Sequence, residues 1–191
     1  MSEGSESALP EELREQVLAA AYDELARWGI DRFSVVALAD RHGLDHAMIL
    51  RHWQSPEELI LEVLLGWPGE DVATPDTGSL RTDLLALATA MARYVESERG
   101  HSLQATHLIG NRNLSSTDVR RTAWRARSGR LRVVIDRAEQ RGDLIEGVDA
   151  LTVLELVFAP INMRALFTGQ PVDDQYCRTV SELVWRAIAR P

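Results

Sequence analysis

The sequence predicts an all-α protein, in which an N-terminal three-helix domain with a helix-turn-helix is followed by a larger helical domain. Apolar residues recur at steps of three and four from end to end of the chain, which is the period of an amphipathic helix. Glycines and prolines interrupt this pattern at intervals, and no alternating strand pattern competes with it. The 45% hydrophobic and 26% charged residues are typical of a globular protein and exclude a disordered chain.

The cysteine content and the N-terminal residues predict the cellular compartment of the protein. Cys177 is the only cysteine among the 191 residues, which rules out an intramolecular disulfide and a four-cysteine zinc site and fits a reducing cytoplasm. Residues 1–12 contain four glutamates and no basic residue, unlike a secretory signal. The most apolar stretch, residues 151–167, is interrupted by two charged residues and a proline, so we expect no membrane span and a cytoplasmic location.

The acidic excess is confined to the front third of the chain. Residues 1–66 contain 13 acidic residues and five arginines, a net charge of −8, whereas residues 67–191 contain 16 of each and are neutral. All 21 basic residues are arginine, which we attribute to GC-rich codon usage. The front third should therefore repel polyanions unless its few cations are well placed.

Four helices are expected in the first 67 residues, each with a recognisable start or stop. The first ends at Gly29, and the second begins at the N-cap Ser34. Asp45 caps the third, and Ser55 with Glu58 forms a capping box for the fourth. Their expected ranges are residues 11–28, 34–41, 45–52 and 55–67.

A cluster of helix breakers predicts a domain boundary after residue 67. Within eleven residues the chain places Pro68, Gly69, Pro75 and Gly78. We therefore expect a disordered acidic tail over residues 1–10, a helix-turn-helix domain over residues 11–67, and a second helical domain over residues 79–189.

The second domain should contain five helices, over residues 80–100, 102–109, 118–140, 151–167 and 174–189. The fourth of these is apolar on nearly every side and kinked by Pro160, and a helix without a polar face must be covered on both sides. The last carries an apolar stripe of Tyr176, Val180, Leu183, Val184 and Ile188. One small domain can hardly cover both helices, so we expect them to pair with a second copy as a four-helix bundle.

Residues 34–53 have the helix, glycine turn and helix of a helix-turn-helix. Gly43 suits the turn because glycine adopts a positive φ at the least steric cost. The second helix of such a unit, here residues 45–52, lies in the DNA major groove.

Together with its flanking helices, this segment resembles the TetR family of bacterial transcriptional repressors. The resemblance is carried by Trp28-Gly29, Ser34, Ala39, Gly43-Leu44, Ile49, Arg51-His52-Trp53, Ser55, Glu57 and Leu59, and by residues 141–173 in the C-terminal part. It implies an all-helical homodimer that binds a near-palindromic double-stranded DNA operator and releases it when a small-molecule effector enters the C-terminal domain. It implies no cofactor and no catalytic residue.

The recognition segment also departs from the family. The family usually has lysine, threonine or serine, and tyrosine in the recognition helix and a lysine at the start of the fourth helix, and here these positions hold His46, Met48, Leu50 and Pro56. Each missing cation removes a phosphate contact. The alternative is therefore a TetR-like ligand-binding or protein-interaction module that has lost specific DNA binding. An enzyme is disfavoured, because the chain has no nucleophile elbow, phosphate loop or paired catalytic carboxylates.

Seven residues of the helix-turn-helix are candidates for DNA contact: Ser34, Arg41, His42, His46, Ala47, Arg51 and His52. Arg51 is the strongest, and Ala47 is small enough to let the helix approach closely. Protonated imidazoles would restore part of the missing positive charge. A plain N-cap at Ser34 and solvated surface for the others are the alternatives. A metal site at His42, Asp45 and His46 is not expected, because Gly43 breaks the helix that would align them.

Six residues are candidates for an apolar effector pocket in the second domain: Met91, Tyr94, His107, Trp124, Phe158 and Asn162. For each, ordinary core packing is the alternative. Asn162 is the strongest because it lies in an otherwise apolar helix and needs a hydrogen-bond partner if buried. Nine arginines between residues 112 and 141 form either a solvated face or a contact with the acidic front domain or an anionic effector. Cys177 is interpreted as a small packing residue.

Overall fold

The computed structural model describes residues 9–66, 74–109 and 114–190, of which residues 99, 106–109 and 114–116 are described by their backbone alone. Helices account for nearly all regular structure in these ranges, and the all-α prediction is confirmed. A single isolated bridge, between Leu144 and Ala189, is the only extended pairing among the described residues. Of the predicted tail over residues 1–10, residues 1–8 lie outside the described residues, while Leu9 packs against the N-terminal core and Pro10 precedes the first helix.

The N-terminal unit contains four helices and one 3-10 turn: α1 (Glu11–Trp28), η1 (Ile30–Arg32), α2 (Val35–His42), α3 (His46–Trp53) and α4 (Pro56–Leu65). The predicted caps are present. Ser34 Oγ accepts a hydrogen bond from the Ala37 amide at 3.3 Å, and Asp45 Oδ1 accepts one from the Ala47 amide at 2.9 Å. The fourth helix is shorter than predicted, since α4 ends at Leu65, and Trp67 lies outside the described residues.

Gly43 makes the turn between α2 and α3. Its φ of 66° and ψ of 34° lie in the left-handed region, and the Leu44 amide donates back to the Ala39 carbonyl at 2.9 Å. A Cβ at this position would meet no atom within 4 Å. The requirement for glycine is therefore conformational and not a matter of space.

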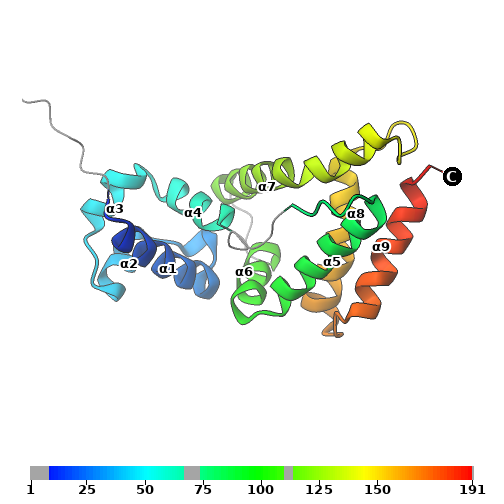
Figure 1. The fold of residues 1–191 in the computed structure, drawn as a ribbon. Coiled ribbons are helices and arrows are strands. Elements are labelled where there is room, and N and C mark those ends of the chain that lie inside the picture. The colour runs from blue at the N-terminus through cyan, green and yellow to red at the C-terminus, as the bar shows by residue number, and fades with distance from the viewer. Residues whose placement is uncertain (1–8, 67–73, 110–113, 191) are drawn as a thin grey trace, which may run out of the picture.

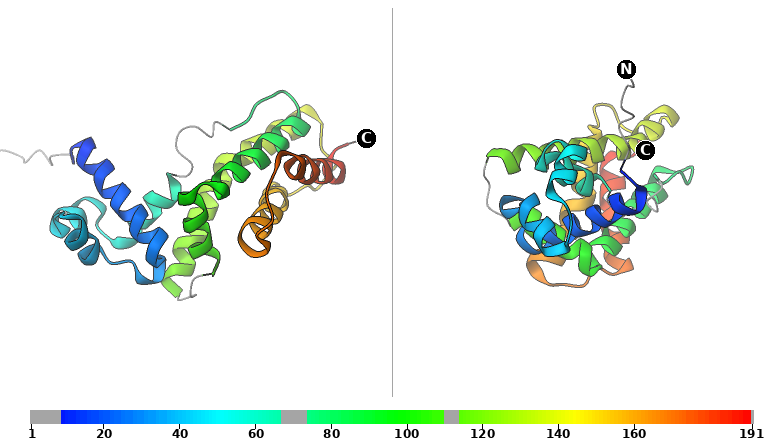
Figure 2. Two further views of the ribbon diagram at one scale, coloured as in Figure 1. Left: turned by 90° about the horizontal axis from the view of Figure 1, so that it is seen from below. Right: turned by 90° about the vertical axis from the view of Figure 1, so that its left-hand side faces the viewer.

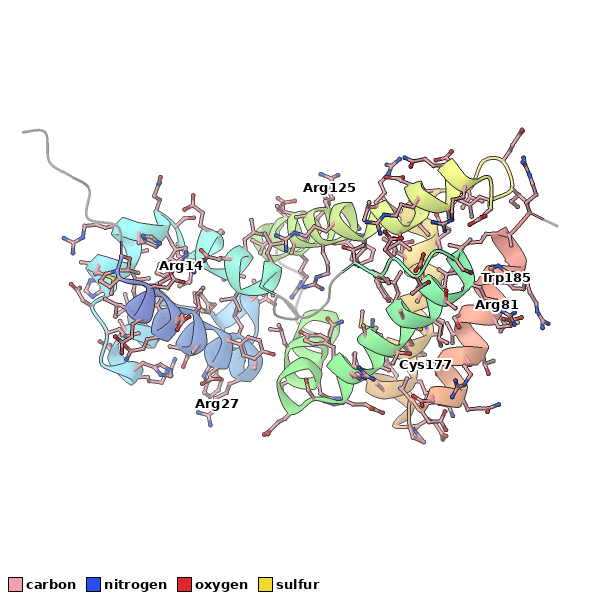
Figure 3. The ribbon with its side chains drawn as sticks, viewed as in Figure 1. Arg14, Arg27, Arg81, Arg125, Cys177 and Trp185 are labelled. Carbon is pink, nitrogen blue, oxygen red and sulfur yellow. The ribbon has the colours of Figure 1, made fainter. Side chains whose placement is uncertain are left out.

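The C-terminal unit is built from five α-helices and a π-helical turn: α5 (Leu80–Glu96), α6 (Glu98–Ile109), α7 (Leu114–Arg141), α8 (Ala150–Asn162), η2 (Met163–Thr168) and α9 (Asp174–Ile188). As Figure 1 shows, α5 lies in the middle of this unit and contacts each of the other α-helices. Arg81 of α5 donates to Glu182 of α9 at 2.8 Å and its guanidinium lies 4.8 Å from the Trp185 ring centroid (Figure 3).

A predicted helix boundary in this unit is wrong. The helix expected to end near Gly100 ends at Glu96, because the Ser97 hydroxyl donates to the Tyr94 carbonyl and accepts from the Gly100 amide. Gly100 lies instead in the first turn of α6, where a Cβ would come within 2.0 Å of the Tyr94 carbonyl oxygen. Leu183, a member of the predicted apolar stripe of the last helix, is 63% exposed on the single chain.

The apolar core forms two clusters, and the N-terminal one crosses into the C-terminal unit. The C-terminal cluster is formed by buried residues of α5, α7, α8 and α9. The N-terminal cluster contains the buried faces of α1 to α4 together with Leu103 of α6 and Val119 and Ala123 of α7. In both views of Figure 2, α6 and one end of α7 adjoin the N-terminal unit. The two units therefore share apolar surface.

Residues Ala150–Thr168 form one helical stretch, with a mean hydropathy of 1.5, that is long and apolar enough to cross a membrane by length and composition alone. This differs from the expectation that no stretch would qualify. The core helix of a soluble protein passes the same test, and the inner side of this stretch packs in the C-terminal core through Val153, Leu154, Val157 and Ile161. Pro160 lies one turn before η2, where the hydrogen-bond pattern widens.

The left-handed conformation of Gly43 predicts how a substitution there changes the free energy of unfolding. Gly43→Ala should lower the free energy of unfolding by about 1 kcal/mol, because alanine resists a positive φ. Gly129→Ala is the matched control, since Gly129 is an exposed residue inside α7 with open space around it, and alanine there should add about 0.5–1 kcal/mol. Urea unfolding measures both. Equal effects of the two substitutions would show that the turn imposes no left-handed requirement.

Candidate nucleic-acid interface and ligand pocket

The exposed side of α3 is the candidate nucleic-acid interface. Ala47 and Arg51 lie one helical turn apart and face away from Ile49 and Trp53, which are buried. His46 and His52 are also exposed. Figure 1 and the left view of Figure 2 place α3 at the end of the molecule opposite α9, so no helix of the C-terminal unit within the described residues lies over this surface.

A hydrogen-bond network centred on Glu62 fixes α3. Trp53 Nε1 donates to Glu62 Oε2 at 2.5 Å, and the other oxygen of Glu62 accepts from Arg14 of α1. His52 stacks edge-to-face on Trp53 with ring centroids 4.5 Å apart. The sequence analysis did not single out Glu62. The sequence feature that could have identified Glu62 is its position, as an acidic residue beside the apolar stripe of the fourth helix.

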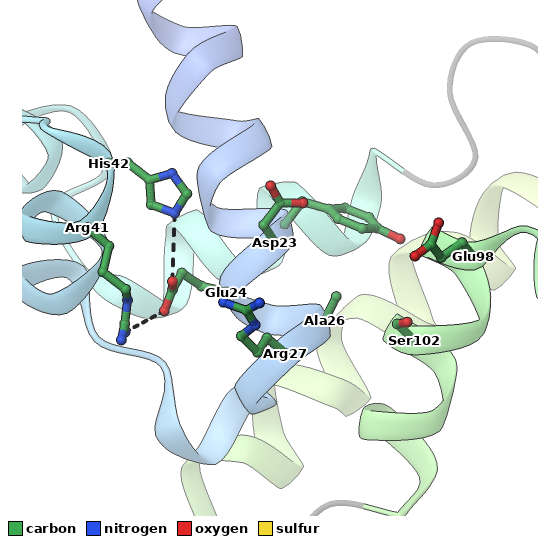
Figure 4. A pocket seen from close by; sticks show the side chains of 9 residues that line it. Asp23, Glu24, Ala26, Arg27, Arg41, His42, Glu98 and Ser102 are labelled. Carbon is green, nitrogen blue, oxygen red and sulfur yellow. Dashed lines mark hydrogen bonds and ion pairs between the residues drawn. The ribbon is translucent and has the colours of Figure 1, made fainter.

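Arg41 and His42 are turned away from this surface. Figure 4 shows both pointing at Glu24 of α1, in a cavity of about 700 Å³ between α1, α2 and α6. Arg41 Nη2 lies 2.7 Å and His42 Nε2 lies 3.7 Å from the Glu24 carboxylate, whose side chain is only 5% exposed. Arg41 also lies 5.8 Å from the Trp28 ring centroid. The structure therefore does not bring these two candidates together with His46, Ala47, Arg51 and His52.

Glu24 is a residue that sequence reasoning missed. It lies among the positions of the first helix that form its buried stripe, one turn from Ala20, Ala21 and Trp28. A carboxylate on such a face needs a cation or hydrogen-bond donors, since burying an unpaired charge is costly. That rule could have predicted a pairing with the arginine of the second helix.

Few cations remain available on the N-terminal unit. Residues 11–66 contain eleven acidic residues and five arginines. Arg14 pairs with Glu11 and Glu62, and Arg41 pairs with Glu24. No ion pair to Arg51 occurs within the described part of the chain. No three His, Cys, Asp or Glu side chains in that part converge as metal ligands.

A second cavity, of about 530 Å³, lies in the C-terminal unit between α5, α6, α7, α8 and η2, and we refer to it as the C-terminal pocket. Four of the six predicted pocket residues line it: Met91, Trp124, Phe158 and Asn162. Asn162 is half-buried, and its Oδ1 accepts a hydrogen bond from Gln104 of α6 at 3.3 Å, which supplies a partner for this amide in an apolar helix. The other lining residues are Thr117, Arg120, Ala123, Arg127, Glu155, Ala159, Met163 and Phe167.

The other two predicted pocket residues are Tyr94 and His107. Tyr94 does not line the C-terminal pocket and packs instead against the C-terminal cluster, where burial and the neighbouring Tyr22 of α1 raise the pKa of its hydroxyl. The side chain of His107 lies outside the described residues.

Two arginines of the pocket wall also contact the N-terminal unit. Arg120 Nη2 lies 3.7 Å from Asp31 Oδ2 of η1, and Arg127 Nη2 donates to the Leu64 carbonyl of α4 at 2.6 Å. Burial lowers the pKa of the Arg127 guanidinium. Sequence reasoning found the arginine run that contains both residues without separating them from their solvated neighbours.

The last two helices expose apolar side chains. Those of Leu151, Leu156, Met163, Phe167 and Leu183 are between 37% and 63% exposed. Cys177 is buried, with its Sγ 3.8 Å from the Ala88 carbonyl, and burial raises the pKa of its thiol. These features favour a packing role for Cys177 in the core of the unit.

A helix-turn-helix unit joined to a helical domain with an apolar pocket defines a one-component DNA-binding regulator. Residues 74–184 match the family model described as "Tetracyclin repressor-like, C-terminal domain". The HTH-type transcriptional regulator YdeS of Bacillus subtilis is 30% identical over 165 residues, which are 85% of this chain and 82% of YdeS. The chain belongs to the TetR family of transcriptional regulators.

Solved structures support the same fold. The TetR family regulator SCO0332 superimposes with a TM-score of 0.71 at 21% identity, covering 94% of this chain and all of that one. The transcriptional regulator FadR of Bacillus subtilis, solved in complex with stearoyl-CoA, superimposes with a TM-score of 0.67 at 17% identity, covering 90% of this chain and 97% of FadR.

The contacts of Arg41 and Arg51 predict that replacing Arg41 lowers the stability of the fold and that replacing Arg51 hardly changes it. Arg41→Ala removes the 2.7 Å partner of a buried carboxylate and should lower the free energy of unfolding by about 1–3 kcal/mol. Arg51→Ala should change it by less than about 0.5 kcal/mol. Adding Glu24→Gln to Arg41→Ala should recover part of the loss, because the charge left unpaired is removed. If Arg41→Ala is as neutral as Arg51→Ala in urea unfolding, Glu24 does not hold Arg41.

Proposed function

We propose that this chain is a dimeric transcriptional repressor of the cytoplasm that leaves a near-palindromic operator when a small molecule binds. Residues 11–67 bind DNA, and residues 79–189 bind the effector and the partner subunit. The observation that carries the proposal is the outer face of α3, where Arg51 and the small Ala47 stand opposite the buried Ile49 and Trp53. Arg51 contacts a base edge or phosphate while Ala47 allows close approach to the groove.

Ser34, His46 and His52 complete the proposed DNA surface. Ser34 caps α2, so its hydroxyl and the first amides of the helix lie where a phosphate can bind. The two histidines flank Arg51 on α3 and add positive charge when protonated. Arg41 and His42 are left out of this surface, since both pair with Glu24 and position α2 on α1.

The C-terminal pocket supports regulation by a small molecule and offers no support for catalysis. It combines a largely apolar wall with a few polar groups, the usual make-up of a small-molecule site. FadR, which shares the fold, binds stearoyl-CoA in its crystal structure. An effector here stabilises a dimer whose two recognition helices no longer match half-sites about 34 Å apart.

A module that has lost specific DNA binding is the second candidate, and the pairing of Arg41 and His42 with Glu24 favours it by leaving few cations on the N-terminal unit.

Selection from a random duplex pool at low salt separates the two candidates. A repressor enriches an inverted repeat, and Arg51→Ala then weakens binding by about 1–3 kcal/mol. Leu50→Tyr with Pro56→Lys should strengthen binding by restoring family contacts. Failure of every variant to enrich a repeat favours the module.

The exposed apolar face of α8, η2 and α9 predicts the dimer interface. Leu183→Glu should convert the dimer to a monomer, because a carboxylate would be buried unpaired in the four-helix bundle. Val36→Glu is the control, since Val36 of α2 is 51% exposed and lies in the other unit. Analytical ultracentrifugation measures the mass of each variant. A Leu183→Glu protein that remains dimeric would place the interface elsewhere.

A further inference from the structure

One face of α7 serves both the C-terminal pocket and the contact between the two units. Arg120, Ala123, Trp124 and Arg127 are spaced by three, one and three residues, so they lie together on this face, and all four line the pocket. Ala123 also belongs to the N-terminal apolar cluster. A ligand in the pocket therefore touches the surface on which the N-terminal unit rests.

The two arginines of this face contact the segments that precede and follow the helix-turn-helix. Arg120 faces Asp31 in η1, which leads directly into α2. Arg127 donates to the carbonyl of Leu64 in the last turn of α4, the helix that follows α3. Both arginines act as tethers between the pocket wall and the N-terminal unit.

Each tether can be exchanged for a stronger contact. The 3.7 Å between Arg120 and Asp31 is longer than a hydrogen bond, although both side chains are only 16% exposed. Asp31 Oδ1 is buried and accepts no hydrogen bond among the described residues. Arg127 reaches a neutral carbonyl. A ligand oxyanion could bind either guanidinium through two parallel hydrogen bonds between ionised groups, which the single neutral carbonyl of Leu64 cannot provide.

The rest of the pocket wall fits an apolar body. Met91, Trp124, Phe158, Met163 and Phe167 contribute large apolar side chains to it. Glu155 of α8 is the acidic residue of the lining set, and it is exposed. The described lining thus contributes two cations and one anion, which suits a ligand with a negative end.

We propose that the effector is an amphipathic anion, with an apolar body and a carboxylate or similar oxyanion, which binds Arg120 and Arg127 and takes them from Asp31 and the Leu64 carbonyl. This rests on the proposed role of the C-terminal pocket as the effector site. The exchange loosens the N-terminal unit from α7. Because coupling between two sites is reciprocal, operator binding weakens the affinity for the anion by the same factor.

Two dyes that differ in one charged group test the ligand class. The fluorescent probe 8-anilinonaphthalene-1-sulfonate carries a sulfonate that N-phenyl-1-naphthylamine lacks. The wild-type protein should bind the sulfonate at least about tenfold more tightly. The Arg120→Gln, Arg127→Gln double variant should lose this preference and bind the neutral dye as before. Equal binding of both dyes by the wild type, or a preference that survives in the double variant, would overturn the proposal.

Two further variants control for charge and for folding. Arg125 lies on the outer side of α7 (Figure 3) and does not line the pocket, so Arg125→Gln should keep the preference. Glu155→Gln removes the opposing charge at an exposed position and should tighten the sulfonate dye while leaving the neutral dye unchanged. If the double variant does not fold, Glu155→Gln still tests whether the pocket prefers an anion. An equal effect on both dyes would contradict an anion site.

Hydrogen exchange tests the tethers without DNA. Saturation with the sulfonate dye should raise amide exchange at residues 30–33 and 62–66 in the wild type, whereas the double variant should exchange rapidly there before any dye is added. Unchanged exchange in the wild type would show that the arginines are not tethers. None of these measurements requires an operator. A protein that prefers the anion yet enriches no DNA sequence would retain this inference and lose the proposed function.

Discussion

The fold depends on an apolar core that the N-terminal unit cannot close alone. Its buried cluster takes Leu103 from α6 and Val119 and Ala123 from α7, so part of its free energy of folding resides in the contact between the two units. The two arginine contacts from α7 cross the same boundary. A change in the position of α7 must therefore alter the packing of the helix-turn-helix, which is the physical basis for coupling a ligand site to a DNA site.

Local features of the sequence predicted the fold well because they are encoded within a few residues. The side chains of Ser34, Asp45 and Ser55 cap the helices that the sequence assigned to them, and the turn at Gly43 has the expected positive φ. Of the six predicted pocket residues, the four that line the cavity lie on helices that the sequence predicted. Short-range capping and periodicity decide these positions, and distant residues have little influence on them.

The ion pairs between different helices were not predicted from the sequence, because they join segments that lie far apart in the chain. The pairing of Arg41 with Glu24 joins residues 17 apart, and that of Arg120 with Asp31 joins residues 89 apart. Each of these arginines could equally have been a solvated surface residue until α1, α2 and α7 were placed. The end of α5 was misplaced for a local reason of another kind: Ser97 competes for the backbone of the last turn, and Gly100 is needed for close approach and not for termination.

The shortage of cations on α3 determines how such a protein can recognise DNA. Each phosphate contact by an arginine or lysine releases condensed counterions, so a reading surface with Arg51 as its unpaired cation draws little affinity from charge neutralisation. Its affinity must come from base and groove contacts, which need close approach, and Ala47 beside Arg51 permits this. In the proposed function two copies are needed, since one weakly charged helix contributes too little, and a rigid dimer adds the second half-site without a further entropic cost of association. The same weakness would make the proposed repressor easy to release from its operator, because a modest change in the spacing of the two recognition helices removes a large share of the total binding free energy.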